Sequence, residues 1–341
     1  MIAASDEIVV PRWDTCFRQS VAPHTPGPGE FRAMRKWLFL LCLGLCACSG
    51  RHEGVLVDSE RNREIEYKVR LPAVQAPAPL VLLSHGSGGH YSNLEWLSDA
   101  LVAAGYVVAV VNHPYNTVRD NTPEGIVRVW DRPGDLSMLL SALLESPRYS
   151  AAIDAQSIGA AGFSSGGYAV IALAGGIYQL SRLQSYCAGE DAGPDCDLAA
   201  GYPVEQASSA SASQRDSRIR AVFAMAPAVG QAMTPDSLAD IDLPVAIFAT
   251  ADDALLKPDL NAQFYAENIP NARLNLLPRG GHFLFISCNT ATTIADWLLP
   301  EFNLCGRGMD VDREALQTET AAQAVEFFNQ TIGRATQSRS Q

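Results

Sequence analysis

Hydrophobic and polar positions follow two different patterns along the chain. From Val55 to Val69, apolar and polar residues alternate on either side of the polar run Asp58–Asn62, which predicts a β-hairpin or two early strands joined by a turn. From residue 80 onwards, short continuous apolar runs are separated by segments with a helical period. Continuous apolar runs are typical of strands that are buried on both faces of a sheet. The change of pattern therefore predicts an early hairpin followed by alternating strands and helices.

This alternation covers most of the chain after residue 80. Strands are predicted over Leu80–Leu83, Tyr106–Val111, Ser157–Ala161, Ile219–Ala226, Val245–Thr250 and Ala272–Leu277. Helices are predicted over Asn93–Ala104, Pro133–Leu144, Tyr168–Gly175, Pro235–Ala239, Leu260–Asn268, Ala291–Leu299 and Arg313–Phe328, and Asn112–Trp130 is predicted as a loop. The pattern indicates an α/β fold with a mostly parallel sheet and helices on both faces, in which ligands bind at the carboxyl ends of the strands. We expect one domain over residues 54–332.

One segment interrupts the alternation. Residues 181–217 are rich in Ser, Ala, Gly and Asp and have only weak periodicity. We interpret them as an insertion over the active face, which acts either as a lid or as a surface loop without a role of its own. The low-complexity part Ala207–Ser213 favours the surface loop as much as the lid.

A G-x-S-x-G pentapeptide, Gly162–Gly166, lies between a predicted strand and a predicted helix. In this context it predicts a sharp elbow that exposes the hydroxyl of Ser164 above the sheet. Glycine is needed on both sides because the strand and the helix approach too closely for a Cβ atom. The pentapeptide alone is a weak signal, since ordinary Gly/Ser loops also match it.

Partners for Ser164 follow two later strands. Strand Val245–Thr250 leads into Asp252 and Asp253, and the last predicted strand is followed by His282 in a glycine-rich loop. A nucleophilic serine needs a general base, and that base needs an orienting acid. The order Ser, Asp, His, with each residue just past a buried strand, is the order in which α/β-hydrolases arrange a triad. We therefore predict that Ser164 is the nucleophile, that His282 is the base and that one aspartate of the pair is the acid.

The loop after the first buried strand, His85–Gly89, is rich in glycine. Backbone N–H groups stabilise the oxyanion of an acyl-transfer reaction, and one of them comes from the residue after the nucleophile. We predict that the N–H groups of Ser165 and Ser87 form this oxyanion hole. A phosphate-binding loop is excluded because the G-x-x-x-x-G-K-[ST] motif is missing.

The beginning of the chain predicts export. A basic start at residues 34–36 precedes the apolar run Trp37–Cys48, which is too short for a comfortable membrane span. The last four residues of the run resemble a bacterial lipobox, with Cys48 as the residue that becomes lipidated. A plain signal peptide and a buried helix of an N-terminal extension are the alternatives. Residues 34–48 are thus predicted as a signal peptide with lipobox, and residues 1–33 as an upstream extension.

Four cysteines follow this segment: Cys187, Cys196, Cys288 and Cys305. An even number of cysteines in an exported chain indicates disulfides. Proximity along the sequence favours Cys187–Cys196 and Cys288–Cys305 among the three possible pairings, with four free buried thiols as the alternative. No cysteine spacing resembles a zinc site.

Composition narrows the classes of function. The 341 residues are 48% hydrophobic and 18% charged, as in a globular protein with a large core. The formal net charge is −12, so the chain lacks the basic footprint of a nucleic-acid-binding protein.

Several of these motifs together resemble an α/β-hydrolase of the dienelactone-hydrolase-like group, which includes the platelet-activating-factor acetylhydrolases. The matching pieces are Ser84–Gly89, Val111–Pro114, Trp130–Asp135, Gly162–Gly167, Arg218–Pro227, Asp253 with Asn261 and Ala262, and Gly281–Phe283. The resemblance implies an α/β-hydrolase fold, a serine hydrolase of the esterase type without metal or cofactor, and Asp253 as the acid of the triad. Dienelactone hydrolases themselves use a cysteine where this chain has Ser164, which favours simple carboxylic esters as substrates.

The leading hypothesis is an exported serine esterase of the bacterial cell envelope, lipid-anchored and facing the periplasm. Its substrate would be a small-molecule or lipid ester, with no nucleic acid as partner. One alternative is a phospholipase A2 or lipase that acts on membrane lipids. Another is a non-catalytic envelope lipoprotein that retains the fold for binding.

Four further polar residues near these motifs are expected to have structural roles. His85 and His113 are expected to organise loops through hydrogen bonds. Arg132 and Asp135 are expected to form an ion pair or a helix cap where the second predicted helix begins.

Overall fold

One mixed sheet of eight strands lies at the centre of the described residues, in the order β1-β2-β4-β3-β5-β6-β7-β8. The structure is a computed structural model that describes residues 51–74, 77–189, 192, 196 and 210–333, so the predicted extension, signal segment and lipobox Cys48 lie outside it. The hairpin predicted from the alternating pattern consists of β1 (Arg51–Asp58) and β2 (Arg63–Arg70), which pair antiparallel. Among the described residues, no helix is long and apolar enough to cross a membrane.

The other strands run parallel to one another. They are β3 (Ala78–Ser84), β4 (Val107–Val111), β5 (Ile153–Phe163), β6 (Ala221–Met225), β7 (Val245–Thr250) and β8 (Ala272–Leu277). All residues of β3, β4, β6 and β7 are buried, and their sequences are apolar throughout except for the last residues of β3 and β7, Ser84 and Thr250. The parallel strands all end on the same side of the sheet, which is called the carboxyl edge below.

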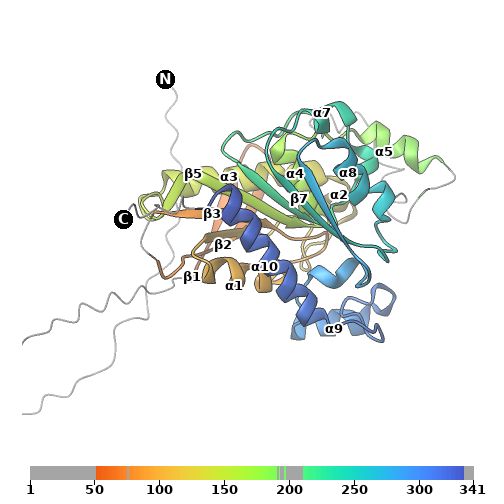
Figure 1. Cartoon of the computed structure of the whole chain (residues 1–341). Helices are drawn as coiled ribbons and strands as arrows, with labels where there is room; N and C mark the ends of the chain where they lie inside the picture. The colour runs from red at the N-terminus through yellow and green to blue at the C-terminus, as the bar shows by residue number, and fades with distance from the viewer. Residues whose placement is uncertain (1–50, 75–76, 190–191, 193–195, 197–209, 334–341) are drawn as a thin grey trace, which may run out of the picture. The chain divides into compact units, whose positions relative to one another are not determined.

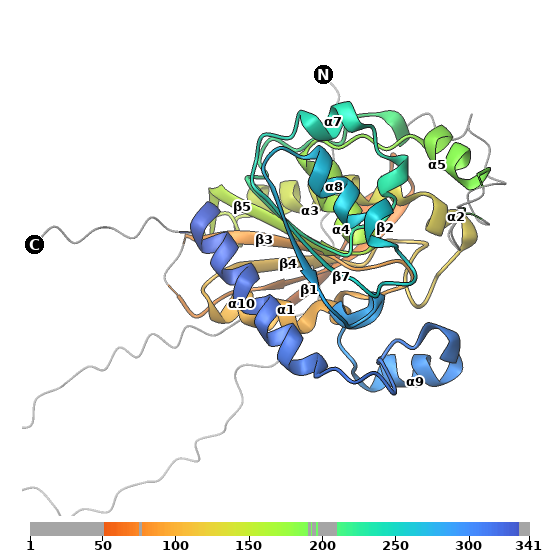
Figure 2. The same cartoon turned by 45° about the vertical axis from the view of Figure 1, so that its right-hand side comes forward.

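Helices cover both faces of the sheet, as Figure 1 and Figure 2 show. One face carries α1 (Glu95–Ala103) and α10 (Arg313–Thr331), and the other carries α3 (Arg132–Glu145), α4 (Ser165–Ala174), α7 (Pro235–Ala239) and α8 (Ala262–Asn268). Neighbouring residues of β3 point to opposite faces, so that Leu82 packs in the core on the α3 and α4 side and Val81 in the core beneath α1 and α10. Each large apolar side chain buried in this way stabilises the layers by about 1.5–3 kcal/mol. The predicted α/β fold is confirmed.

The predicted loop Asn112–Trp130 contains two helical segments and was therefore wrong in part. These are α2 (Pro123–Val127) and the 3-10 helix Val129–Asp131. Thr122 caps α2 by accepting a hydrogen bond from the N–H of Gly125 at 3.0 Å. The five residues of α2 are less than two helical turns, which is too short for a hydrophobic period to appear in the sequence.

The predicted insertion 181–217 is described only in part. It begins within α5 (Leu180–Cys187). Residues 190–191, 193–195 and 197–209 lie outside the described residues, so the lid interpretation stays a prediction. The two disulfides are Cys187–Cys196 and Cys288–Cys305, which are the pairings that sequence proximity favours. The second disulfide closes a segment that contains α9 (Thr290–Leu298).

Candidate active site

β5 ends at the elbow predicted from the pentapeptide. Ser164 follows β5 and precedes α4, and its φ of 56° lies in a region that residues other than glycine rarely adopt. The N–H of Ser164 donates to the carbonyl of Met225 on β6 at 2.9 Å, which helps to hold this backbone conformation. A Cβ on Gly162 would overlap the carbonyl of Gly166, and a Cβ on Gly166 would overlap the carbonyl of Ser84. Both glycines are thus needed for the close approach of strand and helix.

Three predicted site residues form one hydrogen-bonded series at the carboxyl edge. Oγ of Ser164 lies 3.1 Å from Nε2 of His282, and Nδ1 of His282 lies 2.7 Å from Oδ2 of Asp253. The other carboxylate oxygen of Asp253 accepts from the N–H groups of Leu255 and Leu256 at 2.9 and 2.7 Å, which fixes its orientation. Since a carboxylate only accepts hydrogen bonds, Nδ1 carries the proton and Nε2 presents its lone pair to the serine hydroxyl. All three side chains are buried.

The neighbouring Asp252 contacts the backbone instead of the imidazole. Its two carboxylate oxygens accept from the N–H groups of Gly280 and Gly281 at 3.2 and 2.9 Å. Asp252 therefore holds the glycine-rich turn that precedes His282. The sequence pattern did not decide which of the two aspartates contacts the histidine. In the structure it is Asp253 that contacts His282.

Arg313, the first residue of α10, holds the other side of the His282 loop. Its Nη1 donates to the carbonyls of Phe283 at 2.6 Å and Ile286 at 3.0 Å, and its Nη2 donates to the carbonyl of Leu304 at 3.0 Å. No sequence motif indicated this contact, because backbone carbonyls carry no residue-type signal.

The predicted oxyanion loop His85–Gly89 lies against the nucleophile. A Cβ on Gly86 would come within 3.3 Å of the Cβ of Ser164. Ser165 is the first residue of α4, and the N–H groups in the first turn of a helix have no acceptor within that helix. The two residues predicted as oxyanion donors, Ser87 and Ser165, thus belong to the two segments that adjoin Ser164.

Arg132 and Asp135 do not form the predicted ion pair, and no side-chain cap is present at the start of α3. Asp135 pairs with Arg63 of β2, whose Nη2 lies 2.8 Å from the carboxylate. Arg132 donates to the carbonyls of His85 at 2.6 Å and Gly86 at 3.3 Å. The prediction was wrong because the partners of both residues come from segments that are distant in sequence. Burial lowers the pKa of Arg132 to about 9, so the guanidinium still carries its charge at neutral pH.

His85 and His113 form buried hydrogen bonds, as expected. His113 is the middle residue of a second Ser–His–Asp set. Oγ of Ser84 lies 2.8 Å from Nε2 of His113, and Nδ1 of His113 lies 2.9 Å from a carboxylate oxygen of Asp135. All three side chains are fully buried, and burial lowers the pKa of His113 well below its ordinary value. This set has no surface that a substrate can reach, so its role is structural.

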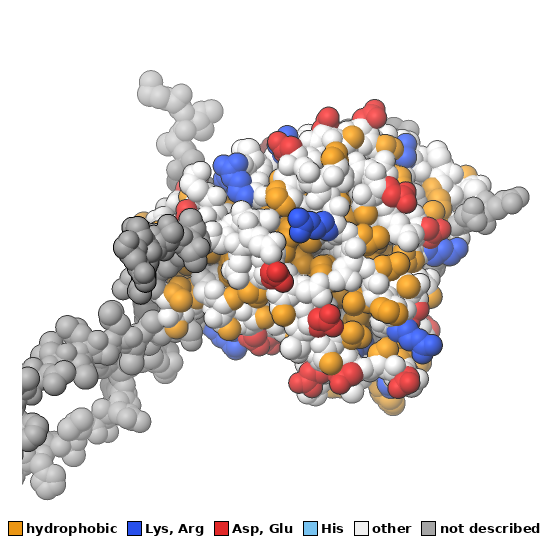
Figure 3. All heavy atoms as spheres, viewed as in Figure 1, with side chains coloured by type: hydrophobic (Ala, Val, Ile, Leu, Met, Phe, Trp, Pro, Cys, Tyr) orange, Lys and Arg blue, Asp and Glu red, His pale blue; other side chains and the backbone are white. Residues whose placement is uncertain are grey.

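α9 places its charged residue inside and its apolar residues outside. Asp296 is buried and pairs with Arg307 at 2.9 Å. The exposed residues Ile294, Trp297, Leu298, Leu299 and Phe302 form what is called the apolar α9 face. Hydrophobic side chains gather over this end of the molecule in Figure 3, next to several acidic ones. The ring of Phe302 lies 6.3 Å from that of Phe283, which in turn lies 5.0 Å from the ring of His282.

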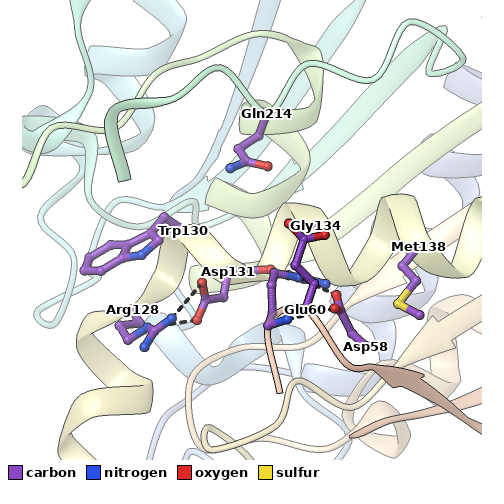
Figure 4. A pocket seen from close by; sticks show the side chains of 9 residues that line it. Asp58, Glu60, Arg128, Trp130, Asp131, Gly134, Met138 and Gln214 are labelled. Atoms are coloured by element: carbon purple, nitrogen blue, oxygen red, sulfur yellow. Dashed lines mark hydrogen bonds and ion pairs between the residues drawn. The ribbon is translucent and has the colours of Figure 1, made fainter. Parts of the chain in front are cut away.

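A cavity of about 490 Å³ lies beside the start of α3. Its lining consists of Asp58, Glu60, Arg61, Arg128, Trp130, Asp131, Gly134, Met138 and Gln214 (Figure 4). Opposite charges in this lining pair with one another, as between Arg128 and Asp131 at 3.0 Å. Since Ser164, Asp253 and His282 do not line the cavity, it is separate from the candidate active site.

Comparison with known proteins identifies the fold. No protein-family model matches the chain, and no curated protein matches its sequence. Among solved structures, the chain is similar to the ferulic acid esterase from Streptomyces cinnamoneus, with a TM-score of 0.58 and 20% sequence identity over 84% of this chain and 91% of that chain. This similarity and the strand order confirm the predicted α/β-hydrolase fold. Within the described residues, no group of three or more His, Cys, Asp or Glu side chains is arranged to hold a metal ion.

Proposed function

We propose that the protein is a serine hydrolase of carboxylic esters. The observation that carries the proposal is the series Ser164–His282–Asp253 on a strained elbow at the carboxyl edge of the sheet. The similar fold of a solved ferulic acid esterase supports the class of reaction. The sequence also resembles the dienelactone-hydrolase-like group, but it has Ser164 where dienelactone hydrolases have a cysteine. This difference supports simple carboxylic esters as the substrates.

The reaction follows from the orientation of the imidazole. Nε2 of His282 removes the proton of Ser164 as its Oγ attacks the ester carbonyl, while Asp253 stabilises the imidazolium that forms. The N–H groups of Ser87 and Ser165 stabilise the oxyanion of the tetrahedral intermediate. The intermediate collapses to an acyl-enzyme and releases the alcohol, which takes a proton from His282. Water activated by His282 then hydrolyses the acyl-enzyme.

Replacement of the nucleophile tests this proposal. Ser164→Ala is expected to lower the turnover of p-nitrophenyl acetate by at least about 10³-fold and to abolish covalent labelling by a fluorophosphonate, read by mass spectrometry. Ser84→Ala is the matched control, because Ser84 also contacts a histidine that an aspartate holds, His113 with Asp135, but is fully buried. The control is expected to retain turnover and labelling at Ser164. A folded wild-type protein that hydrolyses no ester and binds no probe would support the non-catalytic lipoprotein instead.

We also propose that the protein is exported and anchored by a lipid on Cys48, facing the periplasm. The support is the sequence alone: a basic start, an apolar run and a lipobox-like ending. When the full chain is expressed in a bacterium with metabolic palmitate labelling, the wild type is expected in the membrane fraction with label. Cys48→Ser is expected to lose both the label and the membrane fraction, and an unchanged distribution would exclude the anchor.

A second candidate function is hydrolysis of esters at a lipid surface, as in a phospholipase A2 or lipase. The specific observation in its favour is the apolar α9 face, where Trp297 is 73% exposed. Tryptophan and leucine side chains on one side of a helix favour insertion at a lipid–water interface. Phe302 of this face connects through Phe283 to the ring of His282, so a lipid bound there would lie near the triad.

Two substrates distinguish the candidates. Trp297→Ser with Leu298→Ser is expected to lower the hydrolysis of an ester embedded in zwitterionic vesicles by about tenfold or more, without changing the hydrolysis of soluble p-nitrophenyl acetate. Val57→Ser, at a site on β1 that is 65% exposed, is the matched control for an exposed apolar residue and is expected to change neither rate. Equal vesicle rates in all three proteins would leave soluble esters as the substrate class.

A further inference from the structure

The guanidinium of Arg132 is buried beside the loop His85–Gly89. Its side chain is 1% exposed and forms no ion pair among the described residues. Its hydrogen bonds reach the carbonyls of His85 and Gly86 and the side-chain oxygen of Asn116. A buried charge is unfavourable unless hydrogen bonds compensate it. Here the compensation comes from backbone carbonyls of the loop that adjoins the nucleophile, so the charge and the loop geometry depend on each other.

Contacts with carbonyls also fix the direction of N–H groups. In a trans peptide, a C=O and the N–H of the following residue point in opposite directions. Arg132 binds the carbonyl of Gly86, which directs the N–H of Ser87 away from the guanidinium. Gly86 itself lies next to Ser164, since a Cβ on Gly86 would come within 3.3 Å of the Cβ of Ser164. We infer that Arg132 is a positioning residue, which orients the Gly86–Ser87 peptide so that the N–H of Ser87 faces the oxyanion. The inference rests on the proposed function.

Three further contacts restrain Gly86 and Ser87. The carbonyl of Gly86 also accepts from Nδ1 of His85 at 2.7 Å and from the N–H of Gly89 at 3.2 Å. Nδ2 of Asn116 donates to Oγ of Ser87 at 2.9 Å, while the amide oxygen of Asn116 accepts from Arg132. Arg132 thus reaches Ser87 by two routes, through the preceding carbonyl and through Asn116.

Side-chain contacts at the start of α3 hold the backbone next to Arg132. The preceding residue, Asp131, pairs with Arg63 at 3.1 Å and with Arg128 at 3.0 Å, and Figure 4 shows the contact with Arg128. Nη1 of Arg61 donates to the carbonyl of Asp131 at 2.9 Å. These contacts hold the backbone from which the guanidinium extends, so its position relative to the loop is restrained from both ends.

Arg132→Lys tests the inference. A lysine keeps the positive charge but lacks the planar fork that binds two carbonyls together. We expect kcat for p-nitrophenyl acetate to fall about 100-fold with little change in KM, since misplacement of a group near the reaction lowers the rate and not ground-state binding. The affinity for phenylboronic acid, whose tetrahedral adduct with Ser164 resembles the oxyanion, is expected to fall by the same factor. Active sites are counted by titration with a fluorophosphonate, so that unfolded protein does not contribute.

Arg70→Lys is the matched control. The side chain of Arg70 is also mostly buried, at 13% exposure, but it pairs with Asp99 and donates to Oγ of Ser98, and so contacts neither the loop nor the residues that hold Arg132. It is expected to retain kcat and boronic acid affinity for each titrated site, whatever stability it loses. A purely structural role for Arg132 predicts the same behaviour for Arg132→Lys, and that result would overturn the inference.

Asn116→Ala provides a second test if Arg132→Lys fails to fold. It removes the side-chain route from Arg132 to Ser87, and kcat and boronic acid affinity are expected to fall about tenfold with an unchanged KM. Unchanged values in Asn116→Ala would overturn the inference while the wild-type activity stands. A wild type without hydrolysis and without labelling of Ser164 would overturn the proposed function, and the inference with it.

Discussion

At the scale of single residues, two arginines hold the two loops of the candidate active site. Arg132 binds carbonyls of the loop beside Ser164, and Arg313 binds carbonyls of the loop that carries His282. A guanidinium has five donors in one plane and binds several carbonyl oxygens together, which a lysine ammonium does not reproduce. The relative position of serine and histidine therefore depends on side chains that do not take part in the reaction.

The two adjacent aspartates differ in what they are expected to contribute. Asp253→Asn is expected to lower kcat by about 10⁴-fold, because an amide does not hold the protonated Nδ1 of His282 as a carboxylate does. Asp252→Asn is the matched control, and its kcat is expected to fall by about tenfold or less, since Asp252 contacts the turn at Gly280 and Gly281. Steady-state kinetics on folded protein measures both. A larger loss in Asp252→Asn would assign the acid to Asp252.

At the scale of elements, local sequence predicted the strands and the strand ends well. β7 has the predicted range Val245–Thr250, because a strand buried on both faces is continuously apolar. Ser164, Asp253 and His282 each follow a parallel strand, and parallel strands end at one edge, so their proximity was predictable as well.

Contacts between elements were not predictable in the same way. The spacing of Arg132 and Asp135 suggested a pair within one helix, whereas β2 and the loop after β3 supply their partners. α2 was missed because five residues show no period. The sequence did not decide whether Asp252 or Asp253 orients His282, because both residues follow the same strand. Only the tertiary contact between Asp253 and His282 distinguishes them.

The Cys288–Cys305 disulfide is expected to support the His282 loop as well as the fold. Cys288→Ser with Cys305→Ser is expected to lower the free energy of unfolding by about 3 kcal/mol, from the length of the loop that the disulfide closes, and to lower kcat by about tenfold because Phe302 then leaves Phe283. Urea denaturation and ester kinetics measure the two effects.

The other disulfide supplies the control. Cys187→Ser with Cys196→Ser opens a shorter loop, of sequence separation 9 instead of 17, and is expected to lower stability by a similar amount without changing kcat. Equal kinetic losses in both double variants would show that the Cys288–Cys305 disulfide has no specific effect on the His282 loop.

At the scale of the whole molecule, buried neutral histidines are expected to make stability depend on pH. Burial, followed by the charge of Arg132, lowers the pKa of both His85 and His113 well below the ordinary value. The charged and titratable groups that face the pair are Arg61, Arg63, His90, Arg132 and Asp135. Arginines outnumber the carboxylate around these histidines, so protonation of either one in the folded protein is opposed.

Stability is expected to fall as the pH falls through the range from about 6.5 to about 5. In this range the unfolded chain binds a proton at each histidine and the folded protein does not, so the free energy of unfolding decreases by up to about 1.4 kcal/mol per pH unit for each one. Urea unfolding at several pH values measures the slope, which should drop by about half in His113→Gln. Burial raises the pKa values of Asp58 and Asp216, but hydrogen bonds from the backbone and from arginine side chains lower them further, so that both end below the ordinary value. These two carboxylates therefore lose their contribution to stability only at more acidic pH. A flat profile between about pH 5 and 6.5 would mean that the folded protein protonates His85 and His113 as readily as the unfolded chain does.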